Sequence, residues 1–248
     1  VMLSSFGRAA DPSSGGRQTP YNWGDRRHNI VARSAPVGVQ IPQAVGVAQA
    51  ATRRGDRFVV YCSFGEGAAS QGDFHEGMNW AALYRLPVLF LCQNNGWAIS
   101  VPAERQMAGG SVAARAAGYG MEGVSLDGTD PFAVYAAARR AVARALAGGG
   151  PTLIEARVLR LEPHTCDDNH VTYRSAAELA EARERDPLPA VADYLRRAGL
   201  LPEAREAELE RAVAAEIDAA EEQARAAPLP RGEEALEGVT SPPAPGPA

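Results

Sequence analysis

Two short stretches of the chain carry residue types that bind a metal ion and a phosphate group. Gly65-Glu66-Gly67 follows one apolar run, and Asn94-Asn95 follows the next. One carboxylate and one amide oxygen suit Mg²⁺ when phosphate oxygens and water complete its coordination. The glycines let the backbone approach a diphosphate, whose charge the N-terminus of the following helix favours. Either stretch alone is equally explained as a solvated turn, so the interpretation depends on the pair.

Two familiar phosphate motifs are excluded at this position. The pair Gly65 and Gly67 lacks the third glycine of the dinucleotide fingerprint. The stretch from Gly67 to Gly72 is followed by Asp73 and Phe74, where a P-loop needs Lys and Ser or Thr. All basic residues are arginines, so the chain offers no Schiff-base lysine either.

The elements that must position these residues form a βαβ unit. Residues 58–64 and 87–92 are apolar runs typical of buried strands, and residues 70–84 between them have a helical pattern. Such a unit predicts a parallel sheet, whose ligands bind at the carboxyl ends of the strands. Glu66 and Asn95 therefore converge at one edge of the predicted sheet.

Further elements extend this pattern to an α/β fold, a mostly parallel, doubly wound sheet with helices on both faces. Asp130 and Pro131 are a typical helix start. The other predicted elements are helices at 37–52, 131–147, 175–199 and 202–227, and a strand at 152–161. The helix at 202–227 carries one apolar stripe. We expect a mobile segment at 1–20, an α/β domain at 21–200, a C-terminal amphipathic helix at 201–227 and a Pro/Gly-rich tail at 228–248.

Composition narrows the class of protein. The 248 residues include 25 basic and 30 acidic side chains, which argues against general nucleic-acid binding. The three cysteines fit neither a disulfide framework nor a metal knuckle. The apolar stretch from Leu86 to Cys92 has about a third of the roughly 20 residues of a transmembrane helix. We expect a soluble, cytoplasmic protein with no membrane contact and reduced thiols.

The two stretches together resemble the Gly-Asp-Gly…Asn-Asn motif of thiamine-diphosphate enzymes. The resemblance extends from Gly16 to Gly199, where the chain is similar to the alpha subunit of the decarboxylating component of 2-oxo acid dehydrogenase complexes. The segments that carry it are Gly16-Arg-Gln-Thr-Pro, Gln40-Ile-Pro-Gln-Ala-Val-Gly, Gly65-Glu-Gly-Ala-Ala-Ser, Pro163-His-Thr and Tyr173-Arg-Ser. Glu66 between its glycines, and Trp97-Ala-Ile-Ser after Asn95-Gly, most resemble the branched-chain enzyme.

This resemblance implies a thiamine-diphosphate-binding fold that needs Mg²⁺ and decarboxylates a 2-oxo acid, with transfer of the acyl group to a lipoyl acyltransferase core. It also implies a beta subunit in an alpha2beta2 heterotetramer, because in such enzymes part of each site lies on the beta chain. A non-catalytic interaction subunit of the same fold, a pyruvate or acetoin dehydrogenase alpha subunit, and a transketolase-like small subunit stay open as alternatives.

The resemblance also assigns roles to individual residues. Glu66 and Asn95 would bind magnesium through their side chains, and Trp97 through its carbonyl. His164 matches the histidine beside the cofactor, where an imidazole suits proton or acyl transfer. The remaining cofactor-binding positions are Val37, Gly65, Gly67, Ala68, Ile99 and Arg160.

Three departures from the family pattern matter. Gln93 stands where the animal branched-chain enzyme has Arg, which removes a phosphate contact. Val39 replaces a Thr that helps to hold potassium, so we do not expect that ion. A Tyr-Arg pair that the family contributes to the diphosphate lies upstream of Gly16, where this chain has few residues. The site is therefore expected to be incomplete, or completed by residues outside this chain.

Other candidate residues have simpler explanations. His75 is expected at a surface or interface, His28 in a loop, and Cys62 and Cys92 in the core. Cys166 lies in the His164 loop with no group that would activate its thiol.

The acidic residues and the second histidine around His164 are of metal-binding types, but they do not match a known metal site. Glu162, Asp167, Asp168 and His170 have no recognised ligand spacing, so we interpret them as a solvated loop. Thr165 occupies a position where animal relatives carry a regulatory phosphoserine, but we interpret it as an ordinary loop threonine.

Overall fold

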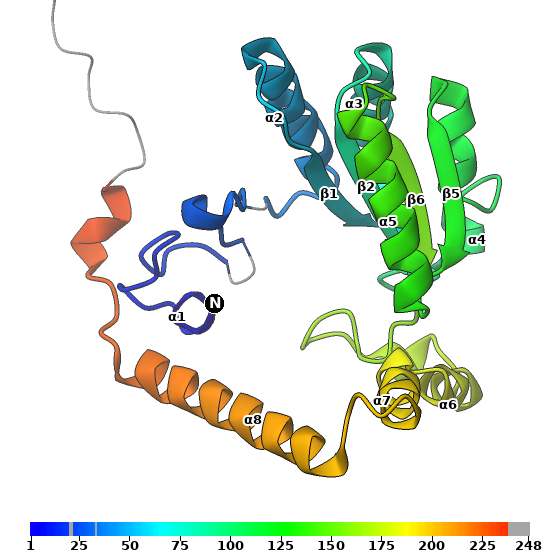
Figure 1. Ribbon diagram of the computed structural model, residues 1–248. Helices are drawn as coiled ribbons and strands as arrows, with labels where there is room; N and C mark the ends of the chain where they lie inside the picture. The colour runs from blue at the N-terminus through cyan, green and yellow to red at the C-terminus, as the bar shows by residue number, and fades with distance from the viewer. Residues whose placement is uncertain (20–21, 33, 238–248) are drawn as a thin grey trace, which may run out of the picture. The chain divides into compact units, whose positions relative to one another are not determined.

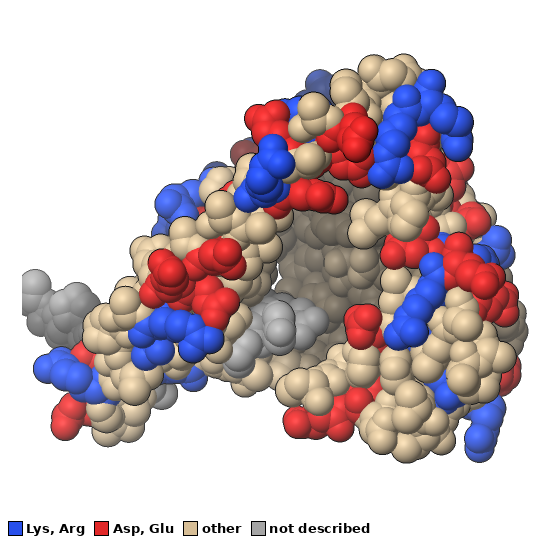
Figure 2. Space-filling model, turned by 90° about the horizontal axis from the view of Figure 1, so that it is seen from below, with Lys and Arg blue, Asp and Glu red and all other residues tan. Residues whose placement is uncertain are grey.

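The computed structural model describes residues 1–19, 22–32 and 34–237. The chain forms two compact units, one of residues Val1–Ala35 with Arg196–Ala248, and one of Pro36–Leu195. Among the described residues, no helix is both long and apolar enough to cross a bilayer. Figure 2 shows acidic and basic side chains interspersed on one face of the molecule, in keeping with the similar numbers of the two kinds.

The unit of residues 36–195 is built on a four-stranded parallel sheet (Figure 1). Its strand order is β1-β2-β6-β5. The strands are β1 (Val60–Gly65), β2 (Val88–Asn94), β5 (Glu122–Asp127) and β6 (Thr152–Arg157). A two-stranded antiparallel ribbon, β3 (Trp97–Ala98) and β4 (Val101–Pro102), follows β2. The predicted parallel sheet is confirmed, and β5 is a strand that the sequence pattern did not reveal.

Helices cover both faces of this sheet, as predicted (Figure 1). On one face, α2 (Gln40–Arg54) and α3 (Gly72–Leu83) pack over a core that includes Phe90 of β2. On the other face, α5 (Pro131–Leu146) packs against Leu89 and Ile154. Successive side chains of a strand point to opposite faces, so β2 supplies both cores.

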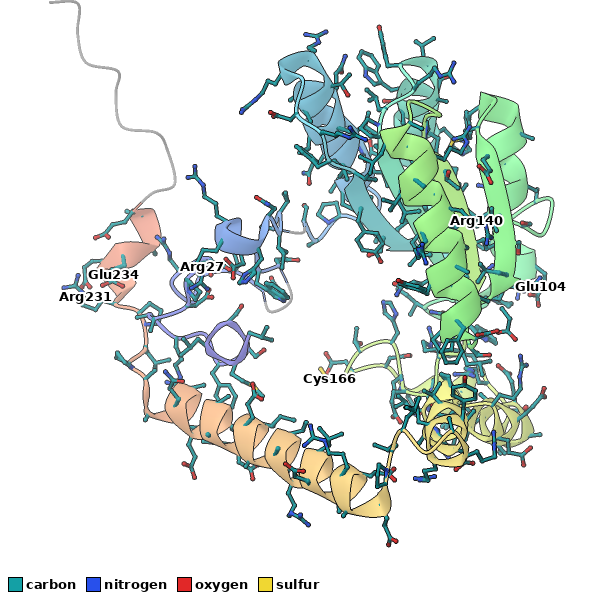
Figure 3. The ribbon with its side chains drawn as sticks, viewed as in Figure 1. Arg27, Glu104, Arg140, Cys166, Arg231 and Glu234 are labelled. Atoms are coloured by element: carbon teal, nitrogen blue, oxygen red, sulfur yellow. The ribbon has the colours of Figure 1, made fainter. Side chains whose placement is uncertain are left out.

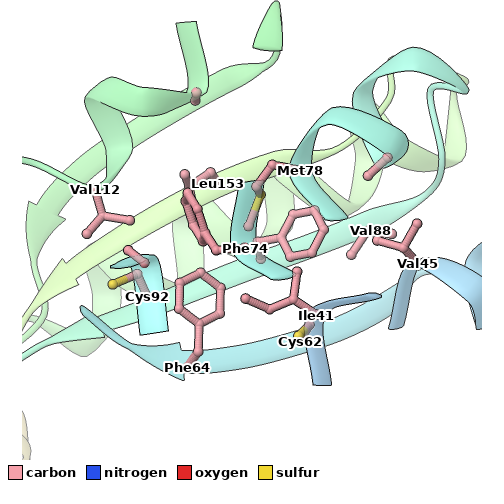
Figure 4. Close-up of a cluster of buried hydrophobic side chains, with 14 of the residues drawn as sticks. Ile41, Val45, Cys62, Phe64, Phe74, Met78, Val88, Cys92, Val112 and Leu153 are labelled. Atoms are coloured by element: carbon pink, nitrogen blue, oxygen red, sulfur yellow. The ribbon is translucent and has the colours of Figure 1, made fainter. Parts of the chain in front are cut away.

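The larger core lies between the sheet and the pair α2 and α3 (Figure 4). It is filled by Ile41 and Val45 from α2, Phe74 and Met78 from α3, and strand residues such as Cys92. Phe64 and Phe74 meet edge to face with ring centroids 5.8 Å apart. Gly77 lets the helices approach closely, because a Cβ there would lie 2.6 Å from Ile41 Cγ2.

Local signals explain where several elements begin and end. The Asp130 carboxylate accepts hydrogen bonds from Phe132 N at 2.9 Å and Ala133 N at 3.1 Å, which confirms the predicted start of α5. Gly55 ends α2 in the left-handed conformation with φ of 75°.

The predicted helix at 175–199 is wrong in one respect, because it is two helices. They are α6 (Ala176–Glu184) and α7 (Pro187–Arg197). Pro187 cannot continue α6, since it has no N–H to donate and restricts the residue before it. The predicted strand at 152–161 ends earlier, at Arg157, where the chain leaves the sheet.

Short elements complete this unit. They are α4 (Ala103–Gln106) and the 3₁₀ helices η2 (Glu66–Ser70), η3 (Ala113–Tyr119) and η4 (His170–Thr172). The segment η2 directly follows β1, so it begins at the carboxyl edge of the sheet, where Glu66 was expected.

The other unit joins the two ends of the chain. It contains α1 (Met2–Ser5), η1 (Arg26–His28), α8 (Glu203–Ala226) and η5 (Gly232–Leu236). Arg17 Nη1 donates to the carbonyl oxygens of Glu234 at 2.5 Å and Glu237 at 2.6 Å. Arg231 Nε donates to Glu234 Oε1 at 2.7 Å, and Figure 3 labels both residues. The part of the predicted tail beyond Glu237 lies outside the described residues.

The apolar stripe of α8 is largely exposed. Leu209, Val213 and Ile217 are all classed as exposed, and only Ala224, near the end of the helix, is buried. The amphipathic pattern thus predicts the helix correctly but not its packing.

Candidate functional site

Glu66 is a buried carboxylate with one unsatisfied oxygen. It begins η2 and is only 1% exposed. Its Oε2 accepts a hydrogen bond from Asn95 N at 3.2 Å, and Oε1 has no partner among the described residues. A buried polar oxygen without a partner is costly, so Oε1 fits the position of a metal ligand. The predicted convergence of Glu66 and Asn95 is confirmed by this contact.

The Asn94–Asn95 stretch folds into two successive side-chain turns. Gly96 N donates to Asn94 Oδ1 at 2.9 Å, and Trp97 N donates to Asn95 Oδ1 at 3.0 Å. Gly96 has φ of 80°, which few other residues adopt easily. An amide oxygen has two lone pairs, so Asn95 Oδ1 keeps capacity for one further ligand. One carboxylate and one amide oxygen at this edge are a donor set that suits Mg²⁺ completed by phosphate and water.

The two glycines flanking Glu66 have different surroundings. A Cβ on Gly65 would meet no protein atom within 4 Å, which leaves open space beside the backbone. A Cβ on Gly67 would lie 3.1 Å from Ala98 Cβ, so packing against β3 already explains that glycine. Ala68 is buried in η2. The open space beside Gly65 thus fits a backbone that a diphosphate approaches. Gly67 is explained by its close packing against Ala98.

Val37 and Ile99 are the two exposed apolar candidates. Val37 precedes Gly38, whose φ is 95° and whose added Cβ would lie 3.2 Å from Gln71 Cβ beside η2. Ile99 lies between β3 and β4 with φ of 57°, an outlier for a β-branched residue. Such strain costs about 1–3 kcal/mol and gathers at functional sites.

A cavity of about 150 Å³ adjoins the Asn95 turn, and Arg160 contributes to its wall. The lining residues are Asn95, Trp97, Leu159, Arg160, Arg174, Glu178, Glu181, Ala182 and Arg185. Arg160 Nη2 donates to Tyr173 Oη at 2.8 Å, but its Nε and Nη1 are buried without a partner among the described residues. Arg160 therefore has two buried donors that no described residue satisfies, and unsatisfied guanidinium donors suit an anion.

Arg174 organises the wall of this cavity and was assigned no role from sequence. It is 5% exposed, and its guanidinium carbon lies 5.9 Å from the centre of the Trp97 ring. Arg174 Nε donates to Glu178 Oε1 at 3.0 Å, and Nη1 donates to Arg160 O at 2.6 Å. Trp97 Nε1 donates to the same Glu178 oxygen at 3.1 Å. Arg174 and Glu178 are four residues apart at the start of a helix, and this spacing could have predicted their ion pair from the sequence. It could not have predicted the contacts of Arg174 with Trp97 and Arg160.

His164 stands apart from these groups. It is exposed, and its imidazole makes no hydrogen bond with any described residue. Its backbone N donates to Asp168 Oδ2 at 2.8 Å, and Tyr173 Oη donates to the same oxygen at 2.6 Å. These bonds hold the pKa of Asp168 below its usual range, the bond from Tyr173 most strongly. Through Tyr173 and Arg160 the loop is joined to the cavity, but no contact brings the imidazole to Glu66.

Glu155 is a second buried carboxylate beside the site, and it was missed from sequence. It lies in β6 and is 1% exposed. Asn94 Nδ2 donates to its Oε1 at 2.7 Å, while Ser111 Oγ and Ala113 N donate to its Oε2 at 2.5 and 3.0 Å. Burial acts to raise the pKa of Glu155, but the bonds from Ser111 and Asn94 outweigh it and hold the pKa below its usual value. Its place in an apolar strand gave no sign of these contacts.

The remaining candidates lie elsewhere. His75 Nδ1 is 2.5 Å from Tyr119 Oη, and His28 Nδ1 is 2.8 Å from Asp25 Oδ2. Cys62 and Cys92 are buried, whereas Cys166 is exposed on the loop after β6 (Figure 3). Within the described ranges, no three His, Cys, Asp or Glu side chains are grouped so as to hold a metal. Besides the Glu66 carboxylate, a metal at this edge would therefore depend on amide, carbonyl and non-protein ligands.

Comparisons with known proteins agree on one family. Residues 1–233 match the family described as dehydrogenase E1 component. The 2-oxoisovalerate dehydrogenase subunit alpha of Bacillus subtilis is 45% identical over 96% of this chain and 72% of that protein. The mitochondrial 2-oxoisovalerate dehydrogenase subunit alpha of Homo sapiens is 41% identical over 92% of this chain and 52% of that protein. The 3-methyl-2-oxobutanoate dehydrogenase subunit alpha of Mycobacterium tuberculosis is 48% identical over 67% of this chain and 46% of that protein. The chain thus spans about half the length of the last two relatives.

Proposed function

The chain belongs to the dehydrogenase E1 component family, and on that premise we propose that it is the alpha subunit of a branched-chain 2-oxo acid dehydrogenase. In this proposal it binds thiamine diphosphate and Mg²⁺, takes part in decarboxylation of a 2-oxo acid, and passes the acyl group to a lipoyl acyltransferase. Relatives named for 2-oxoisovalerate and 3-methyl-2-oxobutanoate support the branched-chain substrate.

The observation that carries the proposal is the unpartnered, buried Glu66 Oε1 beside the Asn95 turn. Glu66, Asn95 and the Trp97 carbonyl would hold Mg²⁺. Gly65 would lie against the diphosphate, since no protein atom fills the space beside its Cα. The remaining candidates, Val37, Ala68 and Ile99, border the same edge of the sheet and would contact the rest of the cofactor.

The chain's own residues have distinct tasks in this proposal. Thiamine diphosphate, when bound, supplies a carbanion that adds to the ketone and an electron sink for the departing carbon dioxide. Arg160 offers two unpaired N–H donors to phosphate oxygens. Arg174 lies over the Trp97 ring and lines the same cavity, so it would hold Trp97 in place. His164 is assigned proton transfer, for which an imidazole on an exposed loop is suited.

We propose that the active assembly is an alpha2beta2 heterotetramer in the cytoplasm, docked on a lipoyl acyltransferase core. The subunit names of the relatives support a partner chain, since a subunit alpha implies a further subunit. The alternative is a non-catalytic interaction subunit of the same fold. Gln93 favours that alternative, because by the resemblance it stands where the animal branched-chain enzyme has an Arg, and its exposed side chain makes no hydrogen bond with a described residue.

The substrate is tested with the assembled complex of this chain and its beta subunit, supplied with thiamine diphosphate and Mg²⁺. We expect decarboxylation of 4-methyl-2-oxopentanoate well above that of pyruvate or acetoin. The reverse preference would overturn the substrate assignment. Inactivity on all three substrates would favour the interaction subunit.

The metal site is tested by calorimetric titration of thiamine diphosphate and Mg²⁺ into the same complex. Glu66→Gln retains the shape of the side chain but removes its charge, so we expect cofactor affinity to fall by about 100-fold or more. Glu122→Gln is the matched control, because Glu122 begins β5, the edge strand farthest from β1, and pairs with Arg144 at 3.1 Å. Equal affinities of wild type and Glu66→Gln would mean that the carboxylate binds no metal.

A further inference from the structure

Glu155 is a buried charge that the proposed chemistry does not use. It occupies the middle of β6, in register with Cys92 of β2 and Ser125 of β5. A hydrophobic residue of similar volume at such a position is often neutral or stabilising relative to a buried ion. The stability of the sheet therefore does not explain why a carboxylate occupies this position.

The Glu155 carboxylate accepts hydrogen bonds on both of its oxygens. Asn94 Nδ2 donates to Oε1 at 2.7 Å. Ser111 Oγ and Ala113 N donate to Oε2 at 2.5 and 3.0 Å. An ionised carboxylate can only accept, so every group that faces Glu155 must present a donor.

This requirement fixes the orientation of the Asn94 amide. With its NH₂ group turned to Glu155, Asn94 must turn its oxygen away, and that oxygen accepts from Gly96 N at 2.9 Å. If the amide rotated by half a turn, Asn94 would place an oxygen against the carboxylate and an NH₂ group against the Gly96 N–H. Both of its hydrogen bonds would then be lost.

The bond that Gly96 N donates to Asn94 Oδ1 closes the turn that holds the proposed metal ligands. Within this turn Asn95 N donates to Glu66 Oε2 at 3.2 Å, and Trp97 N donates to Asn95 Oδ1 at 3.0 Å. Glu155 is thus connected to the three proposed ligands by the Asn94 side chain and the backbone of this turn.

We propose that Glu155 is a positioning residue that orients the Asn94 amide and thereby holds Glu66, Asn95 and Trp97 in the arrangement that binds Mg²⁺. This inference rests on the proposed function, because that function supplies the metal. Glu155 also fixes the backbone at Ala113, so the Ser111–Ala113 segment and the ligand turn depend on the same side chain.

The substitution Glu155→Gln tests the inference with little change in volume. The new amide has one oxygen and one NH₂ group, so it cannot accept on both sides. If its oxygen faces Ser111 and Ala113, its NH₂ group opposes the Asn94 NH₂ group. If its oxygen faces Asn94, its NH₂ group opposes the Ala113 N–H. Either arrangement disturbs one of the two segments.

The double substitution Glu155→Gln with Asn94→Asp restores the pairing with reversed polarity. The new amide then donates to the new carboxylate at position 94, whose other oxygen accepts from Gly96 N. The glutamine oxygen still accepts from Ser111 and Ala113. The formal charge of the pair is the same as in the wild type. Asn94→Asp alone places two carboxylates against each other and is expected to be the poorest binder.

Binding of Mn²⁺ as a spectroscopic probe for Mg²⁺ is measured by electron paramagnetic resonance in the assembled complex with thiamine diphosphate. We expect Glu155→Gln to weaken Mn²⁺ binding by about 10- to 100-fold, as is typical when a group that holds a ligand is changed. We expect the double variant to regain most of this loss and Glu122→Gln to bind as the wild type does.

Amide hydrogen exchange of the metal-free and cofactor-free complex gives a second measurement that does not depend on the ligand. Faster exchange at Asn95, Gly96 and Trp97 in Glu155→Gln, reversed in the double variant, is the expected result. Wild-type Mn²⁺ affinity in Glu155→Gln, or no recovery in the double variant, would overturn the role of Glu155. A wild-type complex that binds no Mn²⁺ would contradict the proposed function itself.

Discussion

Glu66 and Glu155 are two carboxylates buried to the same extent, each 1% exposed, beside the same turn. Both oxygens of Glu155 are satisfied by Asn94, Ser111 and Ala113, whereas Glu66 Oε1 has no partner among the described residues. A buried polar atom without a partner is costly, so the two groups differ in what completes their surroundings. The protein satisfies both oxygens of Glu155, and in the proposed function Mg²⁺ would satisfy Glu66 Oε1.

The ionisation of Glu155 predicts how stability depends on pH. Its folded-state pKa lies below the ordinary value of 4.5, since hydrogen bonds outweigh burial. The ionised group therefore stabilises the fold above that ordinary value, and the stabilisation is lost as the pH falls through the folded-state pKa. We expect the free energy of unfolding of wild type to exceed that of Glu155→Gln by about 2–3 kcal/mol at neutral pH.

This difference should shrink as the pH falls from about 6 to about 3. Urea titrations of both proteins across that range measure it. A difference that stays constant with pH would show that Glu155 is not ionised in the folded protein.

The three thiols are expected to differ in reactivity. Burial raises the pKa of Cys62 to about 12 and also raises the pKa of Cys92, while Cys166 is exposed. Only a thiolate on the surface reacts quickly, so a disulfide reagent at about pH 8 should modify one thiol rapidly and the other two only after unfolding. Cys166→Ser should abolish the rapid phase. Rapid reaction of the buried pair, which Figure 4 shows within the core, would contradict this.

At the scale of elements, two glycines on neighbouring helices predict opposite effects of the same change. A Cβ on Gly77 of α3 would lie 2.6 Å from Ile41 Cγ2, so Gly77→Ala should destabilise the fold by about 1–3 kcal/mol. A Cβ on Gly46 of α2 would meet nothing within 4 Å, so Gly46→Ala should stabilise it by about 0.5–1 kcal/mol. Thermal and urea unfolding of both variants measure the two shifts, and shifts of the same sign would contradict the packing of α2 against α3.

The sequence predicted the elements whose patterns are local. Apolar runs and a glycine turn were enough for β1, β2 and the helix between them, and the geometry of parallel strands then placed Glu66 near Asn95. The break between α6 and α7 was missed although Pro187 marks it. The strand β5 was missed because Glu122-Gly123 and Asp127 dilute its apolar pattern, and its position at the edge of the sheet tolerates that.

The least predictable part of the candidate site is the set of contacts between distant residues. Asn94 and Glu155 are 61 positions apart, and Trp97 and Glu178 are 81 apart. No periodicity or spacing rule connects such pairs, because they meet only after the sheet has formed and the chain has returned along it. Arg174 and Glu155 were therefore found from the structure, while Glu66 and Asn95 were found from their sequence neighbours.

At the scale of the whole molecule, the two ends of the chain are held together within one unit. Arg17 Nη1 donates to the carbonyl oxygens of Glu234 and Glu237, and Ala9 N donates to Pro228 O at 3.0 Å. Arg17→Ala removes the first two bonds, so we expect faster tryptic cleavage after Arg231. Limited proteolysis followed by mass spectrometry measures the rate. Arg139→Ala, on α5 in the other unit, is the control, and equal rates in the two variants would show that Arg17 does not secure this segment.

The order of the strands has a consequence for how this chain tolerates insertions and deletions. Glu66 follows β1, Asn94 ends β2, and Glu155 lies in β6, so the three come from successive strands of one sheet. Loss of a single residue of β6 before Glu155 would turn the later side chains of that strand to the opposite face. Glu155 would then point toward α5 and away from Asn94. Length changes in the surface loops between the strands leave this alternation intact, so natural variation in length should accumulate in those loops and spare the strands.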